Sequence, residues 1–291
     1  MENTKILVIG GTGKTGRKVV ERLTDRGISV RIGSRNATPA FDWNEPSTWA
    51  EALNGINAVY ITFQPDLAVP GAKEAIAAFT DLAVNSGIQK IVLLSGKGET
   101  EAELCEQIVM NAGVKWTIVR ASWFFQNFSE SFFLDPIIAG HVALPKGDML
   151  IPFVDTNDIA DVAVAALLDD QHAGQIYELT GPRQLTFKQI TREIAAATGR
   201  NIQFSAISMD EYTSALRENH VPEDYIWLVE YLFTEVLVDK NSIVTNDVQK
   251  VLGRKATDFA EFAATTAATG VWNAVDAKAT AARLLSSPIS G

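Results

Sequence analysis

The sequence is poor in the residues that most often carry metal and thiol chemistry. Its 291 residues include one cysteine, Cys105, and three histidines. A single cysteine cannot form a disulfide within the chain, which is typical of a protein from the reducing cytoplasm. The histidines, at positions 141, 172 and 220, lie far apart, and none belongs to a His-Glu-x-x-His pattern. The sequence therefore predicts no metal site.

Long apolar runs and an excess of positive charge are also missing. No stretch approaches the ~20 apolar residues that cross a bilayer. The first residues, MENTKILVIGG, lack the basic region of a signal peptide, so we expect a cytoplasmic protein with no membrane partner. The 35 Asp and Glu outnumber the 25 Lys and Arg, which gives a net charge of −10. Because such a chain repels phosphate backbones, we expect no nucleic-acid partner either.

The most informative motif follows the first apolar run. Residues 5–10, KILVIG, are typical of a strand buried on both faces of a parallel sheet. They lead into GGTGKTG and then into a helical pattern. In a dinucleotide-binding turn the first glycine permits the tight turn, the second lets the backbone approach the pyrophosphate, and the third lets helix and strand pack closely. The N-terminus of the helix then binds the phosphates. The residues that we predict to bind a dinucleotide here are Gly10, Thr12, Gly13, Lys14, Thr15 and Gly16.

The same turn also resembles the end of a Walker A loop. That loop requires a glycine five positions before its Gly-Lys pair, and this chain has Val8 there, inside the strand. An ATPase is therefore excluded.

The second strand, expected at residues 28–33, indicates which dinucleotide is bound. NAD-binding chains place an acidic residue at the end of this strand, where its carboxylate accepts hydrogen bonds from the ribose. This sequence has Ser34 and Arg35 instead. A guanidinium can pair with the 2′-phosphate of NADP, and the serine can add a hydroxyl. The predicted cofactor is therefore NADP(H), with Asp42 predicted to flank the adenine.

Strand and helix patterns alternate along the first half of the chain. After the second strand we expect strands at residues 40–43, 58–62, 90–95 and 116–120, and helices at residues 47–53, 69–86 and 101–111. This alternation predicts an α/β fold with a Rossmann-type doubly wound parallel sheet.

We place this NADP-binding domain at residues 1–130 and expect residues Ile151–Leu168, whose helix Asp155 or Thr156 could cap, to pack back on it. Residues 131–274 are predicted to form a smaller mixed α/β substrate domain, with a strand at 175–180 and a helix at 186–198, and residues 275–291 a tail.

Ligands of doubly wound sheets bind at the carboxyl ends of the strands. This rule predicts that two further loops, with the residues Thr62, Phe63, Gln64, Ser95, Gly96 and Lys97, contact the cofactor. Lys97 and Glu103 are the polar side chains that we expect near the nicotinamide, as candidate catalytic residues. A carboxylate such as Glu103 would favour a bound cation. The alternative interpretation is that both residues face the solvent and have no catalytic role.

Aromatic residues supply the candidates for substrate binding. Trp123 and Phe124 follow the strand at 116–120, and Tyr212, Trp227 and Tyr231 belong to two helices expected at residues 208–238, broken near Pro222. Such a helix pair can form a hydrophobic core, or it can cover a pocket for a flat apolar molecule. The predicted substrate is an aromatic or conjugated small molecule.

Two catalytic signatures are missing. No Gly-x-Ser-x-Gly occurs, so a hydrolase elbow is excluded. None of the five tyrosines is followed four residues later by lysine, so the Tyr-x-x-x-Lys pair of short-chain reductases is absent. Because an ordinary ketone needs a proton donor beside the developing alkoxide, two alternatives remain. Either the acceptor is already electron-poor (an iminium, a quinone or a conjugated cation), or the protein binds the dinucleotide as a signal without reducing anything.

Several of these segments together resemble the NmrA-like atypical short-chain dehydrogenases, over roughly residues 4–272. The segments are GGTGKTG, Arg35-Asn36, FDW at 41–43, Ser95, WTIVR at 116–120, WFFQNF at 123–128, IPFVDTNDIA at 151–160 and LTGP at 179–182. Within the family the chain looks most similar to the festuclavine and agroclavine dehydrogenases of ergot-alkaloid pathways. Some relatives carry a lysine on the helix after the fifth strand, whereas residues 102–107, AELCEQ, have none.

The resemblance implies NADP(H) in the glycine turn, Arg35 at its 2′-phosphate, and a small C-terminal domain that closes over the substrate. It also leaves two functions open, because the family includes redox sensors that bind a dinucleotide without turnover. We expect an NADPH-dependent reductase of an electron-poor acceptor. The alternative is an NADP(H)-sensing regulator that binds a protein partner through the acidic residues of 201–274.

Overall fold

The computed structural model describes residues 4–274 of the chain; the predicted tail, residues 275–291, lies outside the described part. The chain forms two compact units. Unit 1 contains the residues up to Ser122 together with Val154–Thr180 and Thr245–Ala256. Unit 2 contains Trp123–Phe153, Gly181–Val244 and the residues from Thr257. The second unit therefore begins at Trp123 rather than at residue 131, and residues 175–180 and 245–256 belong to the first.

Unit 1 is built on a six-stranded sheet in the order β2-β1-β3-β4-β5-β7, with every neighbouring pair parallel. Its strands are β1 (Lys5–Ile9), β2 (Ser29–Gly33), β3 (Ala58–Ile61), β4 (Lys90–Gly96), β5 (Lys115–Ala121) and β7 (Gln175–Leu179). The strand order reverses beside β1, where β2 lies on one side and β3 on the other. This confirms the predicted doubly wound α/β fold and puts the topological switch point next to the glycine turn.

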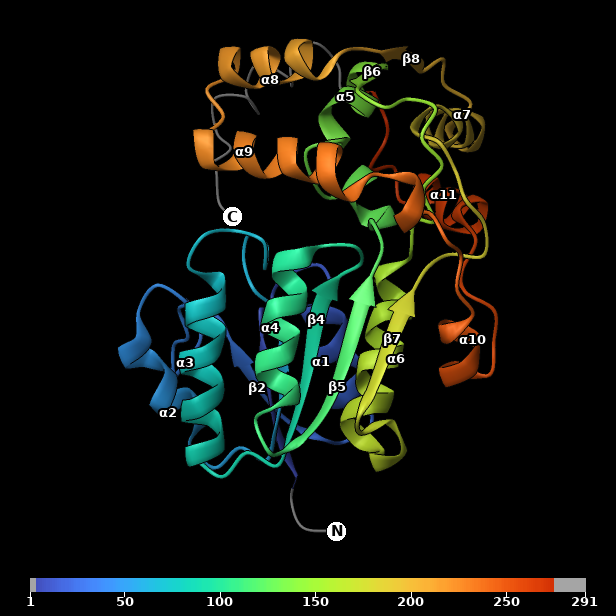
Figure 1. The fold of residues 1–291 in the computed structure, drawn as a ribbon. Helices are drawn as coiled ribbons and strands as arrows, with labels where there is room; N and C mark the ends of the chain where they lie inside the picture. Colours follow the sequence, from blue (N-terminus) through green and yellow to red (C-terminus); the bar gives the residue numbers. More distant parts are fainter. Residues whose placement is uncertain (1–3, 275–291) are drawn as a thin grey trace. The chain divides into compact units, whose positions relative to one another are not determined.

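Helices cover both faces of this sheet. They are α1 (Gly16–Asp25), α2 (Trp49–Leu53), α3 (Ala72–Asn85), α4 (Thr100–Met110), α6 (Thr156–Leu168) and α10 (Asp247–Leu252). Figure 1 shows α3 and α4 together on one face and α1 and α6 on the other. The Asp155 carboxylate accepts a hydrogen bond from the backbone N–H of Asn157 at 2.7 Å, which confirms the predicted cap of α6.

The prediction of a strand at residues 40–43 is wrong. Within residues 4–274, this segment pairs with no strand; Phe41 is buried and Trp43 partly buried by packing on helices instead. The Phe41 ring packs edge-on against Trp43 and Phe79 at centroid distances of 5.0 and 5.5 Å. The Trp43 indole N–H donates to the carbonyl of Thr62 at 3.0 Å. An apolar run predicts burial, but it cannot distinguish burial in a sheet from burial by aromatic contacts.

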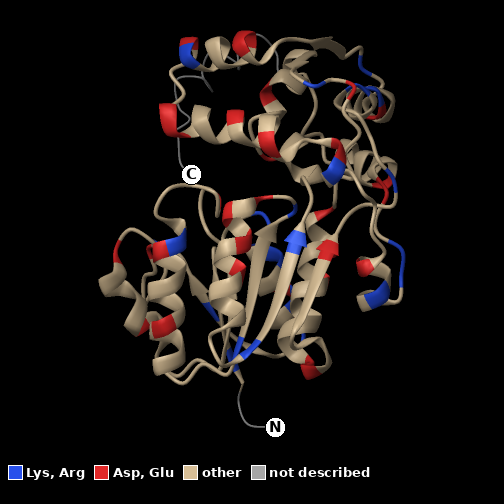
Figure 2. Ribbon diagram, in the orientation of Figure 1, with Lys and Arg blue, Asp and Glu red and all other residues tan. Residues whose placement is uncertain are grey.

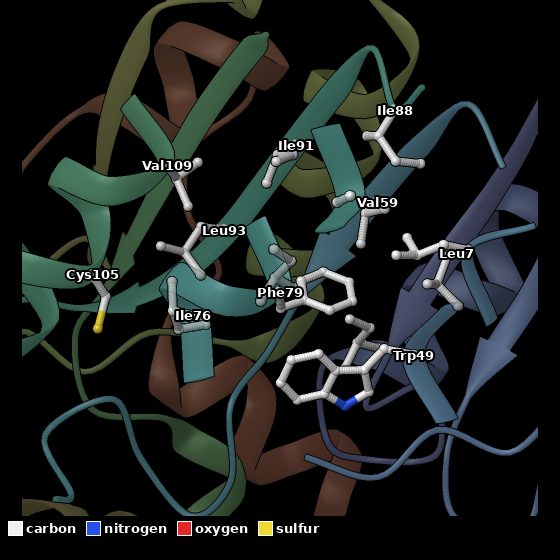
Figure 3. Packing of buried hydrophobic residues seen from close by; sticks show 14 of the residues in the cluster. Leu7, Trp49, Val59, Ile76, Phe79, Ile88, Ile91, Leu93, Cys105 and Val109 are labelled. Carbon is white, nitrogen blue, oxygen red and sulfur yellow. The ribbon is translucent and has the colours of Figure 1, made fainter. Parts of the chain in front are cut away.

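Strand and helix side chains interlock in the core between the sheet and the α3–α4 face (Figure 3). Leu7, Val59, Ile91 and Leu93 from the strands are fully buried there, as is Phe79 of α3. Each such side chain contributes about 1.5–3 kcal/mol relative to an exposed position. This core fixes the positions of the strand ends that carry the candidate site.

Unit 2 has a two-stranded parallel sheet, β6 (His141–Leu144) with β8 (Gln203–Ala206). Its helices are α5 (Leu134–Ala139), α7 (Phe187–Thr198), α8 (Met209–Glu218), α9 (Glu223–Tyr231) and α11 (Phe259–Ala268), and α9 continues into a π-helical turn, Leu232–Val236. The break near Pro222 lies between α8 and α9, as the sequence predicts. Aromatic rings dominate the core of this unit, including Phe128, Phe133 and Phe187. Within residues 4–274, no helix is long and apolar enough to cross a bilayer.

Candidate nucleotide-binding and catalytic site

The glycine turn connects β1 to α1 through very close backbone contacts. Gly10 has a φ of +67° and donates its N–H to the carbonyl of Gly33 at 2.9 Å. The N–H of Gly13 donates to the Gly10 carbonyl at 2.8 Å. A Cβ on Gly16 would lie 2.1 Å from that same carbonyl oxygen. Gly10 therefore needs the left-handed conformation, and Gly16 needs the absence of a side chain.

The N-terminus of α1 carries no negative group of its own. The first turn contains no acidic residue, and the Thr15 side chain does not cap the helix. Instead the Thr15 hydroxyl lies 3.2 Å from the buried Tyr60 hydroxyl, which donates to it. Burial raises the pKa of Tyr60 well above its usual range, and the bond to Thr15 offsets only part of that effect. The positive end of the helix dipole is thus directed at the turn, which suits an anionic ligand such as a diphosphate.

The end of β2 forms a compact turn. The Ser34 carbonyl accepts hydrogen bonds from the N–H groups of Ala37 and Phe41 at 3.1 and 2.9 Å. Arg35 is exposed at this turn, and no acidic residue stands between β2 and position 41. The Asp42 carboxylate accepts from the Asn44 N–H at 2.9 Å, so it stabilises a local loop.

Beyond β3, Thr62 contacts the glycine turn. Its hydroxyl donates to the carbonyl of Ile9 at 3.1 Å and lies where a Gly10 side chain would project, 2.1 Å from that Cβ position. Phe63 packs on Trp43 at a centroid distance of 4.9 Å, and Gln64 is exposed before the cis peptide to Pro65. The loops after β1 and β3 therefore meet at the switch point, as the sheet topology requires.

A pair of carboxyl groups lies beyond the carboxyl ends of β3 and β4. Asp66 and Glu99 are hydrogen-bonded to each other; Glu99 is buried, and Asp66 is partly buried. The Glu99 carboxyl rests against Gly96, the last residue of β4, where a Cβ would come within 1.9 Å of it. Burial, and then the charge of Asp66, raise the pKa of Glu99 well above its usual range. The pair therefore retains a proton at pH values where an exposed glutamate is ionised.

Ser95 and Lys97 flank Gly96, and each is held by a carboxylate. The Ser95 hydroxyl donates to Glu106 at 2.6 Å, and the Lys97 ammonium donates to Glu178 at 2.6 Å. Glu103, by contrast, is half exposed and lies 3.9 Å from the Arg120 guanidinium. The two candidate catalytic residues thus have different surroundings: Lys97 is nearly buried in an ion pair, whereas Glu103 is a surface residue of α4.

In unit 2 the aromatic candidates divide into two groups. Trp123 packs in the core against Phe133, Phe187 and Phe233 at centroid distances of 6.3, 5.7 and 5.3 Å. Tyr212 packs against Phe233 at 5.6 Å, and burial raises its pKa to about 12. Trp227 and Tyr231, one helical turn apart on α9, stack at 5.7 Å with Trp227 44% exposed. Phe124 is half buried.

Sequence reasoning missed the charged partners at the strand ends. Glu106, Arg120, Glu178, Asp66 and Glu99 were not among the candidate residues, although they surround several that were. Arg120 follows the apolar pair Ile118 and Val119, and Glu178 lies between Tyr177 and Leu179, each one residue before the end of its strand. A charge at such a position is a detectable signal, because charged residues are rarely buried without a partner.

Comparison with known proteins gives the family. The model of the NmrA-like family matches residues 2–263. Prestalk A differentiation protein A of Dictyostelium discoideum is 31% identical, over 89% of this chain and 91% of that protein. The NAD(P)H azoreductase of Xenophilus azovorans is 30% identical, over 89% and 96%. The agroclavine dehydrogenase of Claviceps fusiformis, from the predicted subgroup, is 28% identical, over 88% and 95%.

A solved structure supports the fold. The NADPH-dependent quinone oxidoreductase of Escherichia coli, complexed with NADPH, matches with a TM-score of 0.74 at 19% identity, over 89% of this chain and 99% of that one. With the family model covering nearly the whole chain, the glycine turn, the parallel sheet and the resemblance read from the sequence have one explanation: this chain belongs to the NmrA-like family.

Proposed function

We propose that this protein is an NADPH-dependent reductase that transfers a hydride to an electron-poor small organic molecule. The observation that carries the proposal is the contact of Gly16 with the backbone of Gly10 at the uncapped start of α1. A side chain at Gly16 would overlap the Gly10 carbonyl, and one at Gly10 would overlap the Thr62 hydroxyl, so either would displace the turn and the helix start that a diphosphate requires. The named activities of the azoreductase, the agroclavine dehydrogenase and the quinone oxidoreductase support it.

The residues around the turn fit NADP(H) better than NAD(H). The diphosphate would be held by Thr12, Gly13, Lys14 and Thr15 at the positive end of α1. The 2′-phosphate would be held by Ser34 and Arg35, because the turn after β2 offers a guanidinium and a hydroxyl but no carboxylate up to position 41. Asp42 would then flank the adenine through its backbone, since its carboxylate serves the local loop.

The absence of a known proton donor from the sequence indicates which class of acceptor the protein reduces. Bound NADPH supplies a hydride from C4 of its nicotinamide. The chain has no Tyr-x-x-x-Lys pair to protonate an alkoxide, so the acceptor must be activated by its own charge or conjugation, as in an iminium, a quinone or a conjugated cation. The loop Thr62–Pro65, beyond the carboxyl end of β3, would orient this molecule.

Lys97 and Glu103 remain the candidate catalytic residues. The Lys97 ammonium, fixed by Glu178, would offer a positioned positive donor to the nicotinamide end of the cofactor or to an acceptor oxygen. Glu103 is half exposed and would act through its negative charge on a cationic acceptor.

A regulator that senses NADP(H) without turnover is the second candidate. The specific observation in its favour is the name of the relative with 31% identity, which describes a role in differentiation rather than a reaction. The acidic residues of 201–274 would then form the surface for a protein partner. Both functions require the same dinucleotide site, so they differ only in whether NADPH is consumed.

The cofactor assignment is tested by replacing the guanidinium after β2. We expect Arg35→Ala to weaken NADPH binding about 10- to 100-fold, the effect of losing a charge-assisted hydrogen bond, and to leave NADH binding within twofold. Arg26→Ala, which removes an exposed arginine from the other end of α1, is the matched control. Equal losses for NADPH and NADH, measured by calorimetry, would contradict a 2′-phosphate contact.

The reaction is tested with a panel of acceptors. The protein is incubated with NADPH and with quinones, iminium compounds, azo dyes and cationic triarylmethane dyes, and the absorbance of NADPH at its long-wavelength band is followed. Consumption above the buffer rate for any acceptor supports the reductase. Tight NADPH binding without consumption across the panel favours the sensor.

A further inference from the structure

Three charged or polar side chains stand side by side at the carboxyl end of the sheet in unit 1. In the parallel register, Ser95 of β4 pairs with Arg120 of β5, and Arg120 pairs with Glu178 of β7. Register partners in a sheet project from the same face. Figure 2 shows the resulting colours, basic at the end of β5 and acidic at the end of β7.

Arg120 joins two carboxylates in this row. Its Nε and Nη2 donate to Glu106 of α4 at 2.8 and 2.6 Å, and its Nη1 donates to Glu178 at 3.4 Å. Each carboxylate also holds one residue at the end of β4: Glu106 accepts from Ser95, and Glu178 accepts from Lys97, both at 2.6 Å. We call these five residues, Ser95, Lys97, Glu106, Arg120 and Glu178, the β4 ion network.

Burial makes this network more than a set of surface ion pairs. The Glu106 side chain is fully buried, and that of Lys97 is 9% exposed. Buried ion pairs rarely stabilise a fold more than apolar residues of the same size would, because desolvation offsets their attraction. Between their ends the two strands β4 and β5 are mainly apolar, at residues 91–94 and 118–119, so hydrophobic side chains would have served the sheet equally well. What the network adds is a fixed position for the two side chains on either side of Gly96.

Glu178 is the member that controls Lys97. It lies in β7, about 80 residues beyond Lys97 in the sequence, and its backbone N–H donates to Asp247 of α10 at 2.9 Å. Burial tends to raise the pKa of Glu178, but the hydrogen bond and charge of Lys97, together with Arg120, outweigh it and lower the pKa. The carboxylate is therefore ionised at neutral pH and holds the ammonium through a charge-assisted hydrogen bond.

We propose that Glu178 is a positioning residue for the reductase reaction, which it serves by holding the Lys97 ammonium at the carboxyl end of β4. The proposal rests on the proposed function, in which Lys97 contacts the cofactor or the acceptor. Glu178 touches neither and acts through Lys97. Through this contact, strand β7 contributes to the catalytic arrangement although it follows the first 170 residues of the chain.

The first experiment measures the position of Lys97 without any cofactor. The native protein is treated briefly with acetic anhydride, and acetylation of each lysine is quantified by mass spectrometry, with the 63%-exposed Lys250 as internal reference. Glu178→Gln keeps the size of the side chain but removes its charge, and we expect Lys97 acetylation to rise at least fivefold. Glu178→Asp, which keeps the charge, should retain most of the protection. Unchanged acetylation in Glu178→Gln would overturn the proposal.

The second experiment is a double-mutant cycle on kcat with the best acceptor of the panel. We expect Glu178→Gln to lower kcat about 10- to 100-fold, the usual cost of misplacing a reacting group by about 1 Å, with the KM for NADPH changed less than threefold. In a Lys97→Met background the same substitution should change kcat less than twofold, because there is no ammonium left to position. Equal effects in both backgrounds, or no effect in either, would overturn the proposal.

A matched control separates positioning from stability. Asp170 bridges Lys90 and Lys115 at the opposite end of β4 and β5, at 2.9 and 2.5 Å. Asp170→Asn removes ion pairs from the same two strands and should leave kcat and Lys97 acetylation unchanged. If wild-type protein consumes no NADPH with any acceptor, the proposed function fails, whereas a fall in kcat that does not depend on Lys97 defeats only the role of Glu178.

Discussion

The contact between Gly16 and Gly10 allows a sharp test of the dinucleotide site. In Gly16→Ala, the new methyl group would lie 2.1 Å from the Gly10 carbonyl oxygen, 2.7 Å from its carbonyl carbon and 3.0 Å from the Gly11 Cα. All three are backbone atoms, so no side-chain rotation can relieve the overlap. Because a carbon and an oxygen in contact need about 3.2–3.5 Å, the start of α1 must move away from the turn by about 1 Å.

This displacement lowers both the free energy of unfolding and the affinity for NADPH, through separate effects. Overpacking of this kind costs about 1–3 kcal/mol of the free energy of unfolding. The phosphate contacts are affected separately, because a hydrogen bond to a charged group contributes about 1.5–3 kcal/mol and a shift of 1 Å breaks its geometry. Losing one such bond weakens NADPH binding about 10- to 150-fold.

Both quantities are measured on the same samples, NADPH affinity by nicotinamide fluorescence and stability by urea unfolding. Gly27→Ala is the matched control: Gly27 follows the other end of α1 with a φ of +71°, and no other atom of residues 4–274 lies within 4 Å of its Cβ position. Backbone strain should cost this variant about 1–2 kcal/mol and leave NADPH affinity unchanged. If Gly16→Ala binds NADPH within twofold of wild type, the glycine turn does not hold the diphosphate and the proposed dinucleotide site is wrong.

Two further predictions concern carboxyl groups of unit 1. Burial and the charge of Asp66 raise the pKa of Glu99, so the folded protein keeps a proton that the unfolded chain releases, and folding is disfavoured as pH rises above the ordinary glutamate value near 4.5. Glu99→Gln should therefore raise the urea midpoint at pH 7.5 and give little gain at pH 4.5; an equal gain at both pH values would contradict this. Lys115 and Lys90 lower the pKa of Asp170 to about 2, so these ion pairs contribute above pH 3.8 and are lost as pH falls toward 2. The difference in Tm between wild type and Asp170→Asn should accordingly become smaller as the pH falls from 3.8 toward 2. A difference in Tm that does not depend on pH would refute the stabilising role of these ion pairs.

The parts of the fold that depend on neighbouring residues could be predicted from the sequence. The strand, glycine turn and helix of residues 5–25 are contiguous, and each has its own pattern: an aliphatic run, spaced glycines and a 3.6-residue period. The prediction of a strand at residues 40–43 failed because Phe41 and Trp43 pack their rings against Phe79 on α3, a contact that no local pattern indicates. Gln175–Leu179 was recognised as a strand, but its place beside β5 depends on a pairing across more than 50 residues.

The candidate catalytic residues also show that local sequence patterns do not predict contacts between residues that are distant in the sequence. Lys97 and Glu103 were chosen by one rule, their position after the strand at residues 90–95, and that rule cannot tell them apart. The structure separates them because the nearly buried Lys97 has an ion-pair partner in β7, whereas Glu103 remains on the surface of α4. A pairing rule would have been needed as well, because the cations that contact the Glu178 carboxylate, Lys97 and Arg120, lie more than 50 residues before it in the sequence. Position after a strand can therefore identify candidate catalytic residues. Which candidate has a fixed position depends on the charged partners at the strand ends.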